Sequence, residues 1–350
     1  MQRTRGFTLV TMLIALLTCA CSRIQPDSVS FDPDGTAHVS RVVPMPQTVS
    51  PEAQKWLASL TRKKSGSSHL ADIRAATDAW RRDDSAEARR LYPVNVTETQ
   101  IAGVRTDVIT PLTTPEANAG RVLINLHGGG FISDSGSLIE GVPIANLTQT
   151  KVVSVYYRLA PENPFPAAVD DVVAVYKELL KTYKPGSIGI FGTSAGATLT
   201  CEVAVRLKQL GLPLPAALGI FSVHSDYSRA GDSHALFTLD GLPGDLQLPD
   251  PKRTPANAYV GKTDPKDPVL SPIYADLHGM PPSLLLTSTR DLLLSHTVLF
   301  HLALWKAGTS AQLVVFEALP HAFWYHFELP ETQEALHIMA KFFDEKVGRE

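Results

Sequence analysis

The stretch "IGIFGTSAGATL", residues 188–199, decides the fold of this chain. A strand-like apolar run leads into Gly-x-Ser-x-Gly, and a helix-like segment follows directly. A sharp strand-to-helix turn lifts a nucleophile clear of a sheet but strains the backbone at the serine, so small neighbours are needed, and Gly192 and Gly196 supply them. The N-terminus of the following helix places the Ala195 N–H where negative charge develops on a reacting oxygen. The pattern therefore predicts Ser194 as a nucleophile.

The surroundings of this motif distinguish a nucleophile from an idle serine in a glycine-rich turn. Gly-x-Ser-x-Gly alone is a weak signal, and it gains weight when a strand precedes it and an amphipathic helix follows it. Both conditions are met here. Four aliphatic residues after the motif follow the 3.6-residue helical period, namely Leu199, Val203, Leu207 and Leu210. The context therefore favours the nucleophile.

A second glycine-rich motif, "NLHGGGF" at residues 125–131, comes directly after the apolar run "RVLIN". Three glycines let the backbone turn its N–H groups outward without obstruction by side chains, and this pattern forms the other half of an oxyanion hole. The alternatives are a plain loop or an anion-binding nest. We predict Gly128 and Gly129 as the donors and His127 as a brace for the loop.

A nucleophilic serine of this kind needs an acid and a base, in the chain order Ser, Asp or Glu, His. Asp291 follows the strand-like run "SLLLTST", where the competing interpretation is a helix-capping aspartate. His321 follows the last strand-like run, in "QLVVFEALPHAFW". A loop at a strand's carboxyl end lets its imidazole reach both Ser194 and Asp291. His326 and His296 are the weaker candidates for the base.

Strand-like and helix-like segments alternate along most of the chain after residue 93. Nearly continuous apolar runs suit strands buried on both faces of a sheet, whereas residues 169–183 follow the helical period. The alternation predicts an α/β fold with a mostly parallel central sheet and helices on both faces. The strand candidates are "VNVTETQI" and "VRTDVITP" with a turn at Gly103, then "RVLINL", "KVVSVYY", "SIGIFGT", "AALGIFSV", "SLLLTST" and "QLVVFEA", and further helices are expected at 293–307 and 331–346.

We expect residues 93–224 and 281–350 to form the core of the fold. The segments outside this core are expected to have separate roles. Residues 22–50 are rich in Pro, Ser and Asp without a sustained period, which predicts a flexible tether. Residues 51–92 are expected to be N-terminal helices. Residues 225–280 are too long and too rich in Pro, Gly and Asp for a plain connection. We expect them to form a helical cap together with residues 51–92.

The first 21 residues have the layout of an export signal. "MQRTRGFTLVTMLIALLTCACS" begins with Arg3 and Arg5, continues with an apolar stretch and ends in small residues. The uncharged run is short for a membrane-spanning helix. "LLTCAC" resembles a bacterial lipoprotein signal with Cys21 as the lipidated residue, whereas "GFTLVTMLIAL" resembles a prepilin leader less closely, because Thr11 replaces its usual Glu. We expect an exported protein, periplasmic or membrane-anchored.

The composition excludes several classes of function. The chain has 350 residues, of which 44% are hydrophobic and 19% charged, and a net charge of −3. These values are ordinary for a folded protein, and they give no sign of the basic face that nucleic acid requires. No His/Glu or Cys cluster has the spacing of metal ligands, so we expect no metal and no cofactor. Cys201, the one cysteine outside the leader, is expected to be a small buried residue.

Five motifs in order give the chain a resemblance to the bacterial hormone-sensitive-lipase-like carboxylesterases, an α/β-hydrolase family. The motifs are "HGGGF", "YRLAPENPFPAAVDD", "GTSAG", "SPIYADLHGMPPSLLLTS" and "PHAF". The resemblance spans residues 70–347 and implies an α/β-hydrolase fold with a lid from the N-terminal helices and the insertion. It implies a catalytic triad of Ser194, Asp291 and His321. It also implies an oxyanion hole formed by Gly128, Gly129 and Ala195.

The chain also departs from that family. The family often places a second acid four residues after the triad aspartate, whereas this chain has Ser295 there. That leaves the local support of the acid loop open. The leader and the tether are additions to the usual cytoplasmic form. The central motif resembles the GTSAG branch of the family rather than the GDSAG branch.

The motifs and the resemblance together predict a serine carboxylesterase that hydrolyses short-chain esters of small molecules through an acyl-enzyme. Phe131, Phe165 and Trp324 lie beside the motifs and are candidates to line the acyl or alcohol pocket, with ordinary core packing as the alternative. Two other functions remain open: an amidase or lactonase with the same triad, and a non-catalytic ligand-binding receptor on a hydrolase scaffold. The oligomeric state is open as well, a homodimer included.

Overall fold

The computed structural model describes residues 28–60, 69–237 and 255–348, which divide into two units. The first unit is Met1–Met45 and the second is Pro46–Glu350. The predicted leader at residues 1–21, with the lipidation site Cys21, lies outside the described residues. So does the part of the predicted cap at residues 238–254. No helix of the described ranges is both long enough and apolar enough to cross a bilayer.

The second unit is built on an eight-stranded sheet, and every strand candidate of the sequence analysis is part of it. The strands are β3 Val94–Ile101, β4 Val104–Pro111, β5 Val122–Leu126, β6 Lys151–Val155, β7 Ile188–Thr193, β8 Ala217–Phe221, β9 Ser283–Arg290 and β10 Ala311–Pro320. Pairing is parallel from β6 through β5, β7, β8 and β9 to β10. The two remaining pairings, β4 with β6 and β3 with β4, are antiparallel, so β4 is the strand that runs against the others. A turn in which Gly103 has φ +80° joins β3 to β4. The prediction of a mostly parallel sheet is confirmed.

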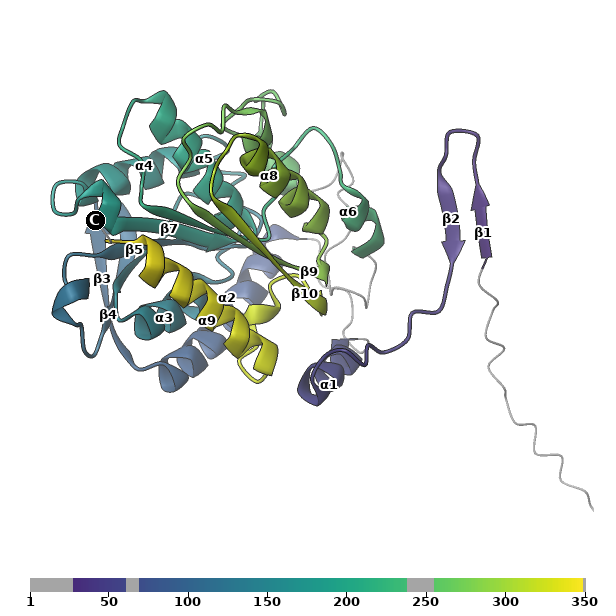
Figure 1. The fold of residues 1–350 in the computed structure, drawn as a ribbon, viewed down its shortest axis with the longest axis horizontal. Coiled ribbons are helices and arrows are strands. Elements are labelled where there is room, and N and C mark those ends of the chain that lie inside the picture. The colour runs from purple at the N-terminus through teal and green to yellow at the C-terminus, as the bar shows by residue number, and fades with distance from the viewer. Residues whose placement is uncertain (1–27, 61–68, 238–254, 349–350) are drawn as a thin grey trace, which may run out of the picture. The chain divides into compact units, whose positions relative to one another are not determined.

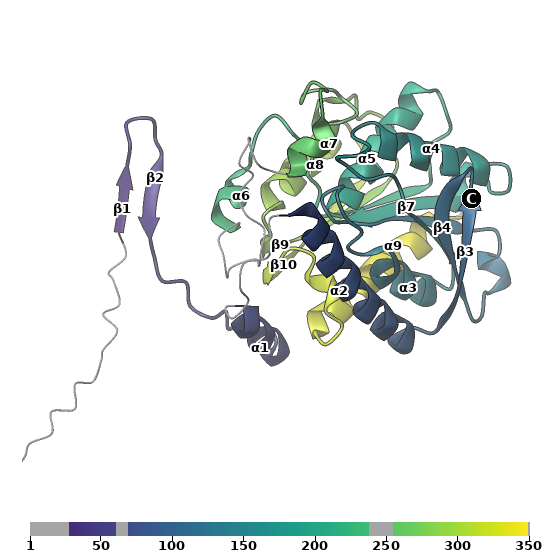
Figure 2. The same cartoon turned by 180° about the vertical axis from the view of Figure 1, so that it is seen from behind.

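Helices cover both faces of this sheet (Figures 1 and 2). One face carries α4 Ala167–Leu179, α5 Ala195–Gln209 and α8 Leu294–Lys306, and the other carries α2 Leu70–Leu91, α3 Ser137–Thr148 and α9 Pro330–Lys346. Each face has its own buried hydrophobic cluster, as expected when apolar strand side chains alternate between two helical layers. The shorter helices are α1 Pro51–Leu60, α6 Asp232–Phe237 and α7 Pro255–Val260.

The strand order creates a crevice at the carboxyl edge of the sheet. The order is β10-β9-β8-β7-β5-β6-β4-β3, so the chain moves from β5 to β6 on one side and then returns to β7 on the other side of β5. At such a switch point the loops that leave neighbouring strands diverge, and ligands bind between them. The "HGGGF" loop follows β5 and Ser194 follows β7, so both glycine-rich motifs lie at this point.

The sequence analysis missed α3, and its composition explains why. The segment "SLIEGVPIANLT" is buried on nearly all sides, because it lies against the sheet and also contacts α2 and α9. A helix buried all round lacks the polar stripe that makes the 3.6-residue period visible. Pro143 also stands inside it, and proline is normally a signal against a helix interior.

The predicted tether at residues 22–50 contains a short element of regular structure, and its flexibility stays a prediction. Residues 28–40 form a hairpin of two exposed strands, β1 Ser28–Phe31 and β2 Ala37–Ser40. Its turn is "DPDG", in which the Gly35 N–H donates to Asp32 O at 2.9 Å. Pro-Asp-Gly is a turn signal, but four-residue strands are too short to show a period. The described residues from Pro46 onward belong to the second unit.

The N-terminal helices pack on the body of the second unit. Ala53 and Leu57 of α1 belong to the same buried cluster as Phe343 of α9. The Ser50 hydroxyl, 2.9 Å from a carboxylate oxygen of Glu331, fastens the start of α1 to the start of α9. That residues 51–92 contribute to a cap stays a prediction.

Candidate active site

Ser194 lies at the strained turn that its sequence predicts. It separates the last residue of β7 from the first residue of α5, and its φ of +60° with ψ of −119° is a conformation that non-glycine residues rarely adopt. Its N–H donates to Phe221 O at 2.9 Å, and its carbonyl accepts from Thr198 N at 3.0 Å. The backbone of Ser194 is therefore held from both sides, which leaves the hydroxyl available for chemistry.

The two flanking glycines are required by the approach of the neighbouring strand. A Cβ atom on Gly192 or on Gly196 would overlap the carbonyl oxygen of Leu126, the last residue of β5. That overlap involves backbone, which cannot rotate away as a flexible side chain could. The Gly-x-Ser-x-Gly spacing thus lets the turn pack directly against the strand that carries the second glycine-rich loop.

Replacing Gly196 with alanine should lower the free energy of unfolding by about 3 kcal/mol or more, because strand and helix must move apart to admit the methyl group. Urea denaturation monitored by circular dichroism measures this. Gly120→Ala is the matched control, since no atom lies within 4 Å of a Cβ built there. Equal stability of the two variants would show that the turn has room that the geometry denies.

The loop after β5 turns its carbonyl groups into the protein. Tyr157 Oη donates to His127 O at 2.6 Å, and Ser135 N donates to Gly128 O at 3.3 Å. The carbonyl of Gly129 accepts from the next turn of the loop. In a trans peptide the N–H points opposite to the C=O of the same unit. Each of these three carbonyls is followed by the N–H of the next residue. These N–H groups therefore point away from the hydrogen bonds that the carbonyls make.

This loop lies beside the predicted nucleophile. A Cβ built on Gly128 would be 3.4 Å from the Cβ of Ser194 and 3.1 Å from Thr193 O. Gly129 has φ of +104°, which an L-side chain would resist. His127 is buried, stacks on Tyr157 with ring centroids 4.1 Å apart, and lies within 2.7 Å of Gly128 O through Nδ1. Its contacts are those of a brace.

Asp291 and His321 form a hydrogen-bonded pair across β9 and β10. His321 Nδ1 is 2.9 Å from Asp291 Oδ1, so Nδ1–H donates and Nε2 keeps its lone pair. Asp291 follows β9 and His321 follows β10, as the sequence analysis expects. Ser194 is at the end of β7, separated from β9 by β8.

Asp291 is buried and receives more than one hydrogen bond. Leu293 N donates to Oδ1 at 2.8 Å, while Thr287 Oγ1 at 3.0 Å and the hydroxyl of Ser222 donate to Oδ2. Burial alone would raise the pKa of Asp291, but the charge of His321 and these hydrogen bonds outweigh it, so the pKa lies below its usual value. The Asp291 carboxylate thus bonds the backbone just before α8, which begins at Leu294, and also bonds His321.

Ser222 and Thr287 hold the Asp291 carboxylate through hydrogen bonds, and sequence reasoning missed both of them. Ser295 stands four residues after Asp291, and its hydrogen bonds join it to Ser233. Ser295 N donates to Ser233 Oγ at 2.9 Å, and Ser233 N donates to Ser295 Oγ at 3.0 Å. This reciprocal pair joins α6 to the start of α8.

Trp324 packs beneath the turn at Ser194. Its indole is 1% exposed, and Nε1 donates to Thr193 Oγ1 at 3.0 Å. The Thr193 hydroxyl in turn donates to Glu140 of α3. Burial raises the pKa of Glu140 to about 8, although the hydrogen bonds from Thr193 and Asn125 lower it in part. The threonine of "GTSAG" therefore links the turn to α3 and to the loop after His321.

Two aromatic side chains, one of them in the "HGGGF" loop, pack against a tyrosine of α7. Phe131 is 2% exposed and stacks on Tyr259 of α7, with ring centroids 3.5 Å apart. Phe165 meets the same ring edge-on at 5.9 Å. Tyr259 Oη donates to Glu202 of α5 at 2.6 Å. These contacts are packing contacts, and a pocket-lining part for Phe131, Phe165 and Trp324 stays a prediction.

The other histidines weighed as bases have different partners. His326 lies against Trp56, with ring centroids 4.4 Å apart. His296 is buried on α8 and stacks on His224, also at 4.4 Å. Of the three histidines considered, His321 is the one hydrogen-bonded to Asp291. Cys201 is buried on α5, and burial raises its pKa well above the usual value, which suits an unreactive packing residue.

The burial of His296 should make stability depend on pH. Burial lowers its pKa to about 4; the carboxylate of Asp226 opposes this only in part, and His234 adds to the lowering. Unfolded histidine has a pKa of about 6.5. Below that pH the unfolded chain binds a proton that the folded protein refuses, so stability is complete above pH 6.5 and is lost as the pH falls towards 4.

When the pH falls from 7 to 5, the free energy of unfolding of the parent protein should decrease. In His296→Gln this decrease should be smaller by about 2 kcal/mol. Urea denaturation at the two pH values measures the loss. The control is His278→Gln, since His278 is on the surface with a side chain 78% exposed. An undiminished loss in His296→Gln would contradict the prediction.

Comparison with known proteins places this geometry among esterases. Residues 123–325 match a family model described as the alpha/beta hydrolase fold. An acetyl-hydrolase of Streptomyces hygroscopicus is 35% identical over 241 residues, which cover 67% of this chain and 79% of that protein. An esterase of Acinetobacter venetianus is 30% identical over 272 residues, which cover 72% and 84%.

Solved structures agree with these relatives. The crystal structure of an esterase named E25 superposes with a TM-score of 0.76 at 31% identity, covering 88% of this chain and 98% of that one. The crystal structure of an esterase from the bacterial hormone-sensitive lipase family superposes with a TM-score of 0.72 at 28% identity, covering 85% and 98%.

Proposed function

The chain belongs to the bacterial hormone-sensitive-lipase-like α/β hydrolases and is a carboxylic ester hydrolase, and from that premise we propose that it works through an acyl-enzyme on Ser194. His321 is the base and Asp291 the acid of the proposed triad. The observation that carries this assignment is the 2.9 Å hydrogen bond between His321 Nδ1 and the buried carboxylate of Asp291. That bond fixes the imidazole tautomer that a serine nucleophile needs.

The proposed reaction proceeds in two halves. Ser194 Oγ attacks the ester carbonyl while His321 Nε2 takes its proton, and the proton then passes to the leaving alcohol as the C–O bond breaks. Water next attacks the acyl-serine, His321 accepts its proton, and Ser194 regains a proton as the acid leaves. Asp291 stays ionised and stabilises the imidazolium that forms twice in the cycle.

We assign the oxyanion hole to the N–H groups of Gly128, Gly129 and Ala195. The loop carbonyls bonded into the protein, and the position of Ala195 as the first residue of α5, support the assignment. Each donor aimed at the developing charge contributes about 3 kcal/mol to the stabilisation of such a transition state.

We propose that the substrates carry short acyl chains. Phe131 stacks on Tyr259, and both rings are buried, so they fill space next to the "HGGGF" loop. This supports a small acyl site. A relative that is 35% identical is named an acetyl-hydrolase. A p-nitrophenyl ester series from acetyl to palmitoyl should show the highest kcat/KM at the short end. Better turnover of long chains in emulsion would reverse the proposal on chain length and leave the triad untouched.

A fluorophosphonate probe tests the nucleophile directly. The probe should label the protein in proportion to active enzyme, and peptide mass spectrometry should place the adduct on Ser194. Prior incubation with a short p-nitrophenyl ester at high concentration should slow the labelling. Labelling at another serine, or none in protein that hydrolyses esters, would refute the assignment.

The alternatives on the same scaffold differ in what they turn over. An amidase would cleave anilides, a lactonase would open lactones, and a ligand-binding receptor would do neither and would not react with a fluorophosphonate. Parallel kinetics on an ester, an anilide and a lactone of matched acyl groups separate them. We expect ester turnover to exceed the other two.

We propose that the N-terminal segment directs export, with Cys21 as the lipidated residue of a membrane-anchored form. The basic start, the apolar stretch and the small residues before Cys21 support this. Mass spectrometry of the mature N-terminus gives the cleavage site and any lipid mass. An unprocessed N-terminus in cytoplasmic protein would contradict it. Size-exclusion chromatography with light scattering decides between monomer and homodimer.

A further inference from the structure

Helix α2 separates its charges by face. At 100° per residue, Arg74, Asp78, Arg81, Arg82, Ser85 and Arg89 lie on one side of the helix, whereas the acids Asp83, Asp84 and Glu87 lie on another. The first side thus carries four arginines and a single aspartate. This is unusual for a chain whose net charge is −3. Arg74 is paired with Glu162, and Arg81 is paired with Asp78 and Asp134. Arg82 and Arg89 have no such partner among the described residues, and an anion between them would relieve their repulsion.

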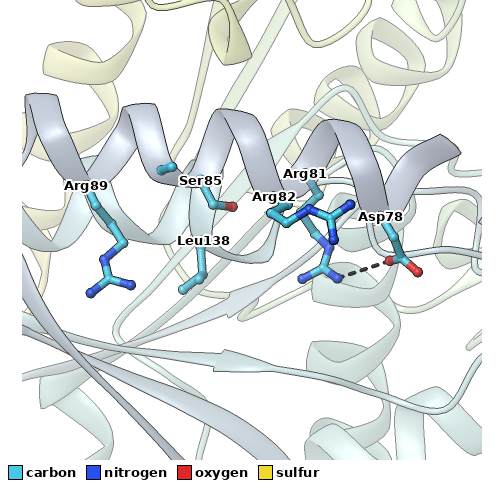
Figure 3. A pocket seen from close by; sticks show the side chains of 7 residues that line it. Asp78, Arg81, Arg82, Ser85, Arg89 and Leu138 are labelled. Carbon is cyan, nitrogen blue, oxygen red and sulfur yellow. Dashed lines mark hydrogen bonds and ion pairs between the residues drawn. The ribbon is translucent and has the colours of Figure 1, made fainter. Parts of the chain in front are cut away.

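A cavity of about 480 Å³ lies along this cationic side, and none of its lining residues belongs to the proposed triad or oxyanion loop (Figure 3). We call it the α2 arginine pocket; Asp78, Arg81, Arg82, Ser85, Arg89 and Leu138 line it. Leu138 belongs to the first turn of α3, so the pocket lies where α2 meets α3. A second cavity of about 240 Å³ shares Asp78 and Arg81 with it and extends the same side of α2 towards Tyr156.

Several polar groups of the pocket have no protein partner among the described residues. Arg81 is paired through its terminal nitrogens with Asp78 at 3.0 Å and with Asp134 at 3.5 Å, but its buried Nε is bonded to nothing. The hydroxyl of Ser85, a residue only 7% exposed, is also unbonded. Arg81 Nε and Ser85 Oγ are thus buried groups without partners, which is costly and points to a ligand that supplies acceptors. The side chains of Arg82 and Arg89 are exposed, and within those same ranges they make neither an ion pair nor a hydrogen bond.

We propose that the α2 arginine pocket binds the phosphate group of a small phosphorylated molecule. Guanidinium groups pair with phosphate oxygens through two parallel hydrogen bonds, and a phosphate monoester carries close to two negative charges at neutral pH. Asp78 and Asp134 already compensate Arg81, and the two positive charges of Arg82 and Arg89 match that of the phosphate group. The Ser85 hydroxyl adds a donor at the inner wall.

The size and lining of the pocket indicate more than an inorganic ion. Cavities of this volume are typical of sites for small organic ligands. Leu138, Ala86 and the methylene stems of the arginines offer apolar surface next to the cationic groups. We therefore expect a phosphate monoester with a short organic body, either soluble or as the head group of a lipid.

Isothermal titration of the full chain with glycerol 3-phosphate tests the proposal. We expect saturable binding, which Arg82→Ala combined with Arg89→Ala weakens at least about tenfold, since each hydrogen bond to a charged group contributes roughly that factor or more. Sedimentation with vesicles of phosphatidylcholine containing phosphatidic acid is the second arm. Binding to these vesicles without binding to glycerol 3-phosphate identifies a lipid head group, and the reverse identifies a soluble ester.

Two further variants separate a site from general charge. Arg90→Ala removes one positive charge from another side of α2, where Arg90 is paired with Glu87 at 2.6 Å, and it should leave the affinity within about twofold of the parent. Ser85→Ala should weaken binding severalfold without lowering stability in the absence of ligand, because the hydroxyl has no partner to lose. Hydrolysis of p-nitrophenyl acetate should be unchanged in all of them, which verifies folding.

Two results would overturn the proposal. One is the absence of binding to both glycerol 3-phosphate and the phosphatidic acid vesicles. The other is a loss of binding free energy per charge removed that is the same in Arg90→Ala as in the Arg82, Arg89 double variant, which would reduce the effect to net charge.

Discussion

Replacing Ser194 with alanine should lower kcat for p-nitrophenyl acetate by about 10⁶-fold, the loss typical of a triad that has lost its nucleophile. Without Oγ no acyl-enzyme forms, and the remaining donors can only polarise the carbonyl for attack by water. The protein should fold normally, because the contacts that hold this turn use the backbone N–H and C=O of Ser194 and not its hydroxyl. Steady-state kinetics, with circular dichroism as the check on folding, measure the effect.

The matched control for this change is Ser59→Ala, which removes the same hydroxyl from the exposed face of α1. It should leave kcat unchanged. The alanine variant should also fail to react with a fluorophosphonate. Hydrolysis by Ser194→Ala within tenfold of the parent would show that another group carries out the attack and would remove the basis of the proposed mechanism.

Replacing Asp291 with asparagine should lower kcat by about 10⁴-fold and leave KM close to its parent value. Asparagine has the same shape but no charge, so the imidazolium of His321 loses its stabilising partner. The carboxylate is fully buried behind the imidazole, which keeps it from direct contact with substrate and explains why binding should survive. Measurement of kcat and KM on one short ester separates the two effects.

The control is Asp276→Asn, which removes a carboxylate from a surface ion pair with Lys208. Its kcat should match the parent. Loss of stability is a second concern, because Asp291 also accepts from Leu293 N and from Ser222 and Thr287. Thermal unfolding of the asparagine variant separates this from catalysis. A folded variant with kcat within tenfold of the parent would refute the role of Asp291.

The sheet followed from sequence alone, and so did the chain positions of the residues proposed for the triad. Strand patterns are local, and an apolar run such as "RVLINL" is buried on both faces wherever it pairs. The Gly-x-Ser-x-Gly turn is local as well, since its strain and its need for glycine arise within five residues. Asp291 and His321 were found because parallel strands bring loops at their carboxyl ends to one edge.

The support around these residues depended on the tertiary structure. Ser222 reaches Asp291 across 69 residues of sequence, and Thr193 bonds Glu140 and Trp324 from opposite directions along the chain. Such partners are set by strand order and by which helix covers which face, neither of which leaves a periodic signal.

The features that escaped prediction share one physical cause. The apolar helix α3 is recognisable only by the sheet, α2 and α9 that cover it, and the α2 arginine pocket exists only because α2 packs against the start of α3. Local sequence determined which residues could react and where strands would form. The folded chain decided which distant side chains would hold those residues in place, because long-range contacts are selected by packing and not by neighbours in sequence.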